Sequence, residues 1–405
     1  LRLQKKRREK DDDLIVDQDC CYYYCCWIDE DLRIFSESIN KFIDKEIEPF
    51  YEKWEEDKWM PREVWNKLGE AGLLCVDIPE EYGGFGVDFR FAALIYDNFY
   101  RRGVGAIAGG GIGVHAGIVA HYILNMGTEE QKQAYLPKMA SGECVGAIGM
   151  TEPGAGSDLK ELKTSAKKVD GGYIINGSKT FISNGQHCDI VVMACKTDPK
   201  AGAKGVSLFI VETNTDGFVK GKKLSKLGIH QQDTSELFFN DMFVPDTALL
   251  GEKNLGFITM MKELPRERLG LAVGAQAASE GMLDITLDYV KERNAFGKRV
   301  ADFQNTRFKL AELATQVRVQ KAFMDQCITL LADNKLDAVT ASMAKLHSTE
   351  LQGKVADECL QFFGGYGYMT EYRIGREFVD ARVQRIYGGT SEIMKEIISR
   401  ELIKD

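Results

Sequence analysis

The succession of hydrophobic patterns along this chain constrains its fold more than any other feature. Between about residues 28 and 145, apolar residues recur at helical spacing, as in "DLRIFSESINKFIDKEI". Residues 146–251 instead contain short β-branched runs broken by glycine, such as "GYIINGSKTFIS", and helical spacing returns over residues 252–405. Spacing of three to four residues predicts helices that bury one face, whereas short runs between turn residues predict paired strands. We therefore expect an α+β chain with an N-terminal α-helical domain, a central antiparallel β-barrel or sandwich domain and a C-terminal α-helical domain, with boundaries at these residues.

Composition excludes some classes of function. The chain has 405 residues, 44% of them hydrophobic, and a formal net charge of -9. An acidic chain has no general attraction for nucleic acid. No window approaches the ~18 uninterrupted apolar residues of a membrane-spanning helix. We expect neither nucleic-acid binding nor a membrane span.

Residues 1–27 differ from the rest of the chain. They hold four of the ten cysteines, as two Cys-Cys pairs around three tyrosines. This spacing lacks the Cys-x-x-Cys pattern that favours zinc. We interpret the segment as a disordered tail or a non-native extension, and we expect no metal site. The six remaining cysteines are scattered, which is typical of buried thiols in a reducing compartment.

Four short motifs could carry chemistry. "MTEPGAGSDL" (150–159) combines glycines, which allow close approach of the backbone to a ligand, with hydroxyl side chains. "RNAFGKRVADFQ" (293–304) gathers cations before an amphipathic helix, and "QFFGGYGYMTEY" (361–372) interrupts a helical pattern with two glycines. Each of the three, taken alone, is more typical of a structural feature than of a binding site: a plain turn, a solvated helix start and a helix break, respectively.

The fourth motif, "ELPRERLG" (263–270), places Glu267 on a helix between two arginines. A glutamate in an apolar pocket has a raised pKa, which suits a general base near neutral pH. Most Glu-Arg neighbours on helices are nevertheless exposed to solvent, so this motif alone does not establish a catalytic site.

Together, "MTEPGAGSD", "RNAFGK", "GGYGYMTEY" and "IYGGTSEIM", in this order, resemble the acyl-CoA dehydrogenase family over nearly all of residues 28–405. Among its members the chain is most similar to the long-chain acyl-CoA dehydrogenases. The resemblance implies a C-terminal four-helix bundle, bound FAD, and FAD-dependent α,β-dehydrogenation of a long-chain acyl-CoA to trans-2-enoyl-CoA in fatty-acid β-oxidation.

The resemblance also implies which residues hold FAD. Those expected at the isoalloxazine are Ile148, Met150, Thr151, Gly156, Ser157, Phe181, Ile182 and Ser183. Those expected to reach the adenosine and pyrophosphate of a neighbouring subunit's FAD are Arg293, Gln304, Gln361, Phe362, Phe363, Gly364 and Gly365, and Thr390, Ser391 and Glu392 follow on the same cofactor.

For catalysis, many family members place a glutamate at the position of Gly388, but long-chain and isovaleryl-CoA members place it at the position of Glu267. The resemblance therefore implies that Glu267 removes the α-proton while the β-hydride passes to flavin N5, and that Gly388 is space left vacant. Residues expected to contact the acyl-CoA are Ser157, Ala203, Lys204, Pro265, Arg266, Arg268, Gly388 and Gly389, with Arg268 at the CoA nucleotide end.

Partners and alternatives follow from the same resemblance. We expect electron-transferring flavoprotein as electron acceptor, a homotetramer, and a bacterial cytoplasm or mitochondrial matrix. The alternatives are a branched or short-chain (isovaleryl-CoA-like) dehydrogenase and a flavin monooxygenase on the same fold. Retention of Glu267 and of the Gly-Gly-Thr segment argues against the monooxygenase, and intact FAD motifs argue against a non-enzymatic acyl-CoA-binding subunit.

Overall fold

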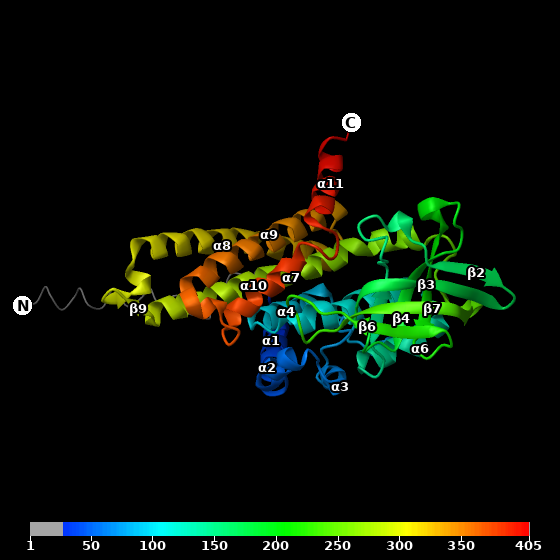
Figure 1. Cartoon of the computed structure of the whole chain (residues 1–405), viewed down its shortest axis with the longest axis horizontal. Coiled ribbons are helices and arrows are strands. Elements are labelled where there is room, and N and C mark those ends of the chain that lie inside the picture. The colour runs from blue at the N-terminus through cyan, green and yellow to red at the C-terminus, as the bar shows by residue number, and fades with distance from the viewer. Residues whose placement is uncertain (1–26, 405) are drawn as a thin grey trace, which may run out of the picture.

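The computed structural model describes residues 27–404 and has the expected order of a helical domain, a β domain and a second helical domain. In Figure 1 the β domain lies at one end of an elongated molecule, and helices α8 (Gln304–Ala332), α9 (Ala338–Phe363) and α10 (Arg373–Gln384) lie at the other. Helix α7 (Gly256–Glu292) runs along both parts. The expected α+β architecture, with helical domains on either side of a β domain in the sequence, is confirmed.

The N-terminal domain consists of helices that bury one face. Trp27, at the start of the described chain, is buried, and its indole donates a hydrogen bond to Asp325 at 2.9 Å, so this residue belongs to the folded structure. The cysteine-rich segment before it lies outside the described residues. The elements of this domain are α1 (Glu30–Phe42), η2 (Ile43–Ile47), α2 (Glu48–Asp57), α3 (Glu63–Glu70), η3 (Glu80–Tyr82), α4 (Phe89–Arg101), η4 (Ile107–Val119), α5 (Ala120–Met126) and α6 (Glu129–Ala140).

Helix η4 is a π-helix of 13 residues, and it is continuous with α5. Stretch Ile107–Met126 is long and apolar enough to cross a membrane, with a mean hydropathy of 1.4. The expectation that no segment approaches a spanning helix is therefore wrong on length and composition. However, 67% of this stretch is buried inside the protein, as is typical of the core helix of a folded domain.

The β domain is one sheet in the order β6-β7-β3-β2-β4-β5-β8, with β1 paired to β4. Most pairs are antiparallel, as expected, but β1–β4 and β2–β4 are parallel. The strands are β1 (Gly146–Gly149), β2 (Ser165–Val169), β3 (Gly172–Ser183), β4 (Ile190–Lys196), β5 (Val206–Glu212), β6 (Phe218–Lys223), β7 (Thr234–Pro245) and β8 (Leu249–Leu250); the short 3-10 helices are η5 (Leu159–Glu161), η6 (Gly202–Gly205) and η7 (Asp246–Ala248).

In the C-terminal domain, α7 packs against α8, α9 and α10 as the long central helix of a bundle. Helix α11 (Ser391–Leu402) projects away from the rest of the molecule in Figure 1. The remaining elements are β9 (Asn294–Ala295), β10 (Lys298–Arg299), η8 (Val300–Asp302) and η9 (Gly364–Tyr368). The first turns of α7 lie beside η4 and the β domain, so all three domains meet there.

Candidate active site

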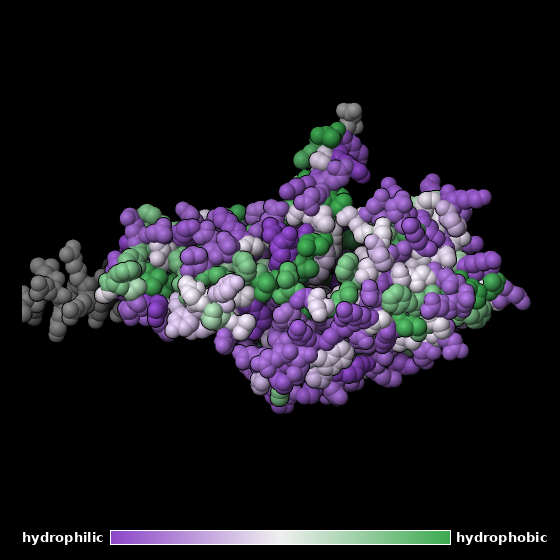
Figure 2. Space-filling view, viewed as in Figure 1, coloured by the Kyte–Doolittle hydropathy of each residue, from purple (hydrophilic) through white to green (hydrophobic). Residues whose placement is uncertain are grey.

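A cavity of about 660 Å³ lies where the three domains meet. This volume is within the usual range for sites that bind small molecules and cofactors. Figure 2 shows a hollow between the base of α11 and the β domain, with hydrophobic side chains around it. Helices η4 and α7, the β domain, and the segment that leads into α11 each contribute residues to the cavity wall.

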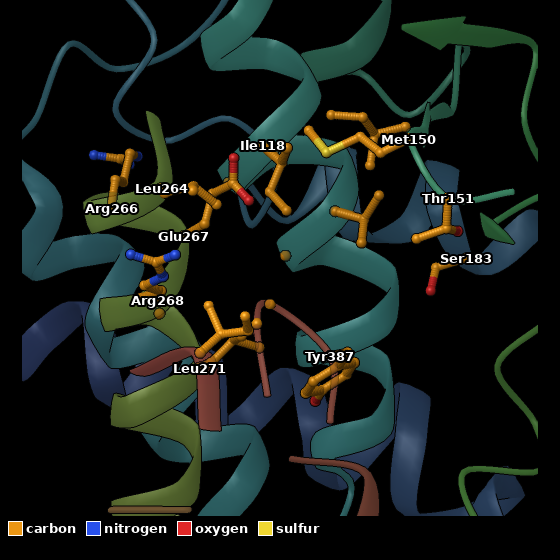
Figure 3. A pocket seen from close by; sticks show the side chains of 18 of the residues that line it. Ile118, Met150, Thr151, Ser183, Leu264, Arg266, Glu267, Arg268, Leu271 and Tyr387 are labelled. Atoms are coloured by element: carbon orange, nitrogen blue, oxygen red, sulfur yellow. The ribbon is translucent and has the colours of Figure 1, made fainter. Parts of the chain in front are cut away.

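Glu267 occupies the α7 wall of this cavity, and its carboxylate points into the cavity (Figure 3). Burial raises the pKa of Glu267 to about 7. The Tyr122 hydroxyl donates a hydrogen bond to Glu267 Oε1 at 3.1 Å and lowers the pKa, as does the charge of Arg268, while the charge of Glu263 raises it. The outcome is a carboxyl group that is divided between its two protonation states near neutral pH, which suits proton transfer in either direction.

The turn at Gly388 and Gly389 forms another part of the wall. Both residues have positive φ values, +63° and +97°, which favour glycine. A Cβ atom at Gly388 would lie 2.4 Å from Leu271 Cδ1. The expectation of vacant space at Gly388 is therefore wrong: the Leu271 side chain fills it, and a glutamate at residue 388 would not fit unless Leu271 moved.

Two buried cations support this turn from behind. Lys345, which is fully buried, donates to the Gly389 carbonyl at 2.5 Å. The Arg268 guanidinium lies beside Gly389 and donates to Ser342 Oγ at 3.3 Å. Burial, together with the charge of Arg268, lowers the pKa of Lys345 to about 8. The hydrogen bond from Lys345 holds the Gly389 carbonyl and so fixes the orientation of that peptide group.

The β-domain wall contains all eight residues expected at the isoalloxazine, from Ile148 to Ser157 and from Phe181 to Ser183. Strand β3 has a bulge between Lys179 and Ile182, and Phe181 adopts a left-handed φ of 59° within it. Bulges re-aim side chains, and Phe181 is 69% exposed on the cavity side. A left-handed backbone conformation is strained for phenylalanine, and such strain is often found at functional sites.

The loop after β1 is tied to this bulge. Thr180 N donates to the Thr151 carbonyl at 3.0 Å, and the Thr151 hydroxyl donates to the Thr180 carbonyl. Behind the loop, Lys179, which is fully buried, pairs with Glu152 at 2.8 Å. These contacts hold the loop rigidly against the sheet.

This wall fits a planar ring system such as that of FAD. A Cβ atom added at Gly156 would meet no atom within 4 Å, so the backbone there is open to a ligand. The wall includes the hydroxyl-bearing residues Thr151, Ser157 and Ser183 as well as the apolar side chains of Met150 and Phe181. Flat apolar surface with a few polar groups is the lining that a heteroaromatic ring requires.

A second hollow, of about 430 Å³, lies at the other end of α7. Its lining includes five of the predicted adenosine-binding residues, Arg293 and Phe362–Gly365. The Arg293 guanidinium lies 5.8 Å from the centre of the Tyr366 ring. Cβ atoms at Gly364 and Gly365 would meet nothing within 4 Å. The other two predicted residues, Gln304 and Gln361, are exposed to solvent and do not line the hollow.

Arg266 is part of the cavity lining, as expected, but its charged group is engaged elsewhere. Its side chain points away from the cavity centre in Figure 3 and forms an ion pair with Asp77. Arg268 is 4% exposed and lies inside the cavity wall. This position contradicts the expectation that Arg268 reaches the nucleotide end of CoA, because that end must remain accessible from solvent.

The other predicted contacts lie outside the cavity lining. Ala203 and Lys204 are in η6, and Pro265 lies within α7 beside Arg266. Thr390 is the N-cap of α11 and accepts a hydrogen bond from Ile393 N at 3.3 Å. Ser391 is buried and Glu392 is exposed.

The sequence analysis did not identify Tyr96 and Tyr122. Tyr96 lines the cavity opposite Gly113 and Gly117, and Tyr122 bonds Glu267. Neither lies in a recognisable motif. The signal that could have marked Tyr122 is a tyrosine among the apolar residues of a helix expected to be buried, because a buried tyrosine hydroxyl usually finds a hydrogen-bond partner.

Comparisons with known proteins agree with this geometry. Residues 29–143, 147–242 and 254–403 match the N-terminal, middle and C-terminal domains of acyl-CoA dehydrogenases. The chain is 49% identical over 374 residues to the mitochondrial long-chain specific acyl-CoA dehydrogenase of Sus scrofa, which covers 92% of this chain and 86% of the relative.

It is 37% identical over 379 residues to the mitochondrial isovaleryl-CoA dehydrogenase of Solanum tuberosum, covering 93% of this chain and 92% of the relative. The crystal structure of an acyl-CoA dehydrogenase from Geobacillus kaustophilus superposes with a TM-score of 0.91 at 47% identity, covering 93% of this chain and 99% of that one.

Proposed function

This chain belongs to the acyl-CoA dehydrogenase family of oxidoreductases, and we propose that it catalyses the FAD-dependent α,β-dehydrogenation of long-chain acyl-CoA to trans-2-enoyl-CoA in fatty-acid β-oxidation. The family is flavin dependent. The observation that carries the proposal is the Glu267 carboxylate, which faces the cavity with a pKa of about 7.

In the proposed reaction Glu267 is the base that removes the α-proton of the thioester. The α-C–H electron pair becomes the new C=C bond, the proton passes to the carboxylate, and the β-hydrogen leaves with its electron pair. When bound, FAD supplies the acceptor for that hydride. Glu267 is divided between its ionised and protonated forms near pH 7, so a sufficient fraction is ionised to act as the base.

The turn at Gly388 is the proposed site for the thioester carbonyl. Within residues 27–404 the Gly388 N–H has no hydrogen-bond acceptor, and the residue lines the cavity. A backbone N–H aimed at a developing oxyanion is typically worth about 3 to 4 kcal/mol in the transition state. Lys345 and Arg268 would keep this turn fixed while the charge develops.

Preference for a long acyl chain is supported by the walls of the cavity. Gly109, Gly113 and Gly117 line it and add no side-chain bulk, and the η4 side chains between them that reach the cavity, Val114 and Ile118, are apolar. The 49% identity to the porcine long-chain enzyme exceeds the 37% identity to the potato isovaleryl-CoA enzyme.

A substrate series tests this preference. We expect kcat/KM for palmitoyl-CoA to exceed that for isovaleryl-CoA and for butyryl-CoA by at least tenfold, with an artificial electron acceptor in each assay. A higher kcat/KM for isovaleryl-CoA would replace the long-chain assignment with the branched-chain alternative, and absence of turnover with every thioester would favour the monooxygenase.

Three further properties are part of the proposal. The reduced cofactor passes its electrons to electron-transferring flavoprotein, the chain assembles as a homotetramer, and it works in a mitochondrial matrix or a bacterial cytoplasm. Relatives from both kinds of organism support the last point without choosing between them.

A further inference from the structure

We propose that Tyr122 is a positioning residue for Glu267: its hydroxyl holds one carboxylate oxygen and leaves the other oxygen facing the cavity. The inference rests on the proposed role of Glu267 as the base and deepens it.

The contact between these side chains is specific. Tyr122 Oη donates to Glu267 Oε1 at 3.1 Å, and this is the one hydrogen bond that Glu267 accepts on its side chain within residues 27–404. Tyr122 is fully buried, so its ring is fixed by the packing around it. Because Oε1 is engaged, Oε2 is the oxygen free to receive a proton from a ligand in the cavity.

A second bridge fixes the two helices that carry the pair. Asp77 accepts from His121 Nε2 at 3.1 Å through one oxygen and pairs with Arg266 through the other. His121 precedes Tyr122 in α5, and Arg266 precedes Glu267 in α7. The two helices are therefore tied at adjacent residues, which fixes the separation of the Tyr122 hydroxyl and the Glu267 carboxylate.

The groups that face Glu267 come from both helices. Burial of Glu267 acts first and raises its pKa, Tyr122 of α5 lowers it by hydrogen bonding, Glu263 of α7 raises it and Arg268 of α7 lowers it. Glu263 is itself bonded by Asn125 of α5 at 3.0 Å. Burial also raises the pKa of Tyr122 well above its usual value, so Tyr122 stays protonated and can donate over the working pH range.

Tyr122→Phe removes the hydroxyl and keeps the ring. Loss of this hydrogen bond should raise the pKa of Glu267, because the bond stabilises the ionised carboxylate. The acid limb of the plot of kcat/KM against pH should therefore move to higher pH by on the order of one unit. At pH 6 we expect kcat/KM with palmitoyl-CoA to fall roughly tenfold, with a smaller loss at pH 9. Tyr122→Leu, which also lacks the hydroxyl, should show the same shift and provides a second variant if the first folds poorly.

Tyr82→Phe is the matched control. Tyr82 is also a buried tyrosine that donates to a glutamate, Glu129, at 2.8 Å, but it lies outside the cavity. The plot of kcat/KM against pH for Tyr82→Phe should superpose on that of the wild type.

Infrared titration of the purified holoenzymes gives a readout that does not depend on turnover. The carboxyl band that is missing in Glu267→Gln identifies Glu267, and that band should titrate at higher pH in Tyr122→Phe than in the wild type.

An acid limb and a carboxyl band that titrate as in the wild type, in folded Tyr122→Phe and Tyr122→Leu proteins, would overturn the role of Tyr122. This failure is distinct from failure of the proposed function. If Glu267→Gln retained dehydrogenation, Glu267 would not be the base; if Glu267→Gln were inactive while Tyr122→Phe kept the wild-type profile, only the role of Tyr122 would be wrong.

Discussion

At the residue scale, the burial that suits Glu267 to catalysis also makes its ionised form destabilise the folded protein. A carboxylate removed from water is disfavoured in its charged form, and the hydrogen bond from Tyr122 offsets only part of this cost. The protein retains the charge at a place where a neutral side chain would be more stable.

This cost predicts a gain in stability on substitution. The pKa of Glu267 is about 7 in the folded protein against a reference value of 4.5, so the wild type loses stability as the pH rises through this interval and the loss is complete above it. Glu267→Gln should therefore be the more stable protein at pH 8, by at most ~3 kcal/mol. At pH 4 the two should unfold alike.

Thermal unfolding of the two proteins at pH 4, 6 and 8 measures this difference. We expect the Tm of Glu267→Gln to exceed that of the wild type by an amount that grows with pH. A lower Tm for the variant at pH 8, or a difference that does not change with pH, would contradict the account of Glu267 as a buried, destabilising carboxyl.

Single residues also mark the limit of what the sequence predicts. The motif around Glu267 was recognisable, but the orientations of Arg266 and Arg268 depend on Asp77 and Ser342, which lie 189 and 74 residues away. Tyr122 contacts Glu267 across 145 residues. Such partners follow from the packing of helices and carry no local pattern.

At the element scale, the helices and strands could be predicted because each buries one face or alternates its side chains. The hydrogen-bonding pattern within them could not. The 13-residue π-helix η4 has the same apolar composition as an ordinary buried helix, and the parallel pairing of β1 with β4 joins strands separated by 40 residues of sequence. Residues of this π-helix line the cavity, in keeping with the frequent occurrence of π-helical turns at functional sites.

The wall formed by η4 predicts an effect on chain length. Gly113 lines the cavity, and a side chain there would have the Tyr96 ring at ordinary contact distance, 3.5 Å from its Cβ, and the Ala108 carbonyl at 3.0 Å. Gly113→Leu must therefore extend into the cavity. We expect the ratio of kcat/KM for palmitoyl-CoA to that for butyryl-CoA to fall ~10- to 100-fold, because overpacking of this kind costs about 1–3 kcal/mol.

Gly111→Ala is the control for this substitution. Gly111 lies on the same helix, and its added Cβ would lie 3.7 Å from the Trp65 ring, outside the cavity. Steady-state assays of both variants should show a change of the ratio in Gly113→Leu alone. An unchanged ratio in Gly113→Leu would mean that this stretch of η4 does not contact the acyl chain.

At the scale of the whole molecule, α7 connects two sites. Glu267 lies near its start, and Arg293 caps its end at the second hollow. Twenty-six residues of helix span roughly 39 Å at 1.5 Å per residue. One cofactor would not reach from the β-domain wall to the second hollow of the same chain. This supports the expectation that Arg293 and its neighbours reach the FAD of a neighbouring subunit in a symmetric oligomer.

The order of the three domains was evident from the sequence because hydrophobic spacing changes near residues 146 and 252. Their meeting at one cavity was not, since it depends on α7 crossing from the bundle to the β domain. The family resemblance supplied the residues of the site, and the folded chain supplied their environment: the ionisation of Glu267, the blocked position at Gly388, and the buried cations behind the turn.

Anaerobic titration of the purified holoenzyme with palmitoyl-CoA, followed by flavin absorbance, tests the central claim most directly. We predict rapid bleaching of the oxidised flavin in the wild type, and loss of bleaching in Glu267→Gln while the cofactor remains bound. Bleaching that persists at the wild-type rate in Glu267→Gln would contradict the assignment of Glu267 as the base.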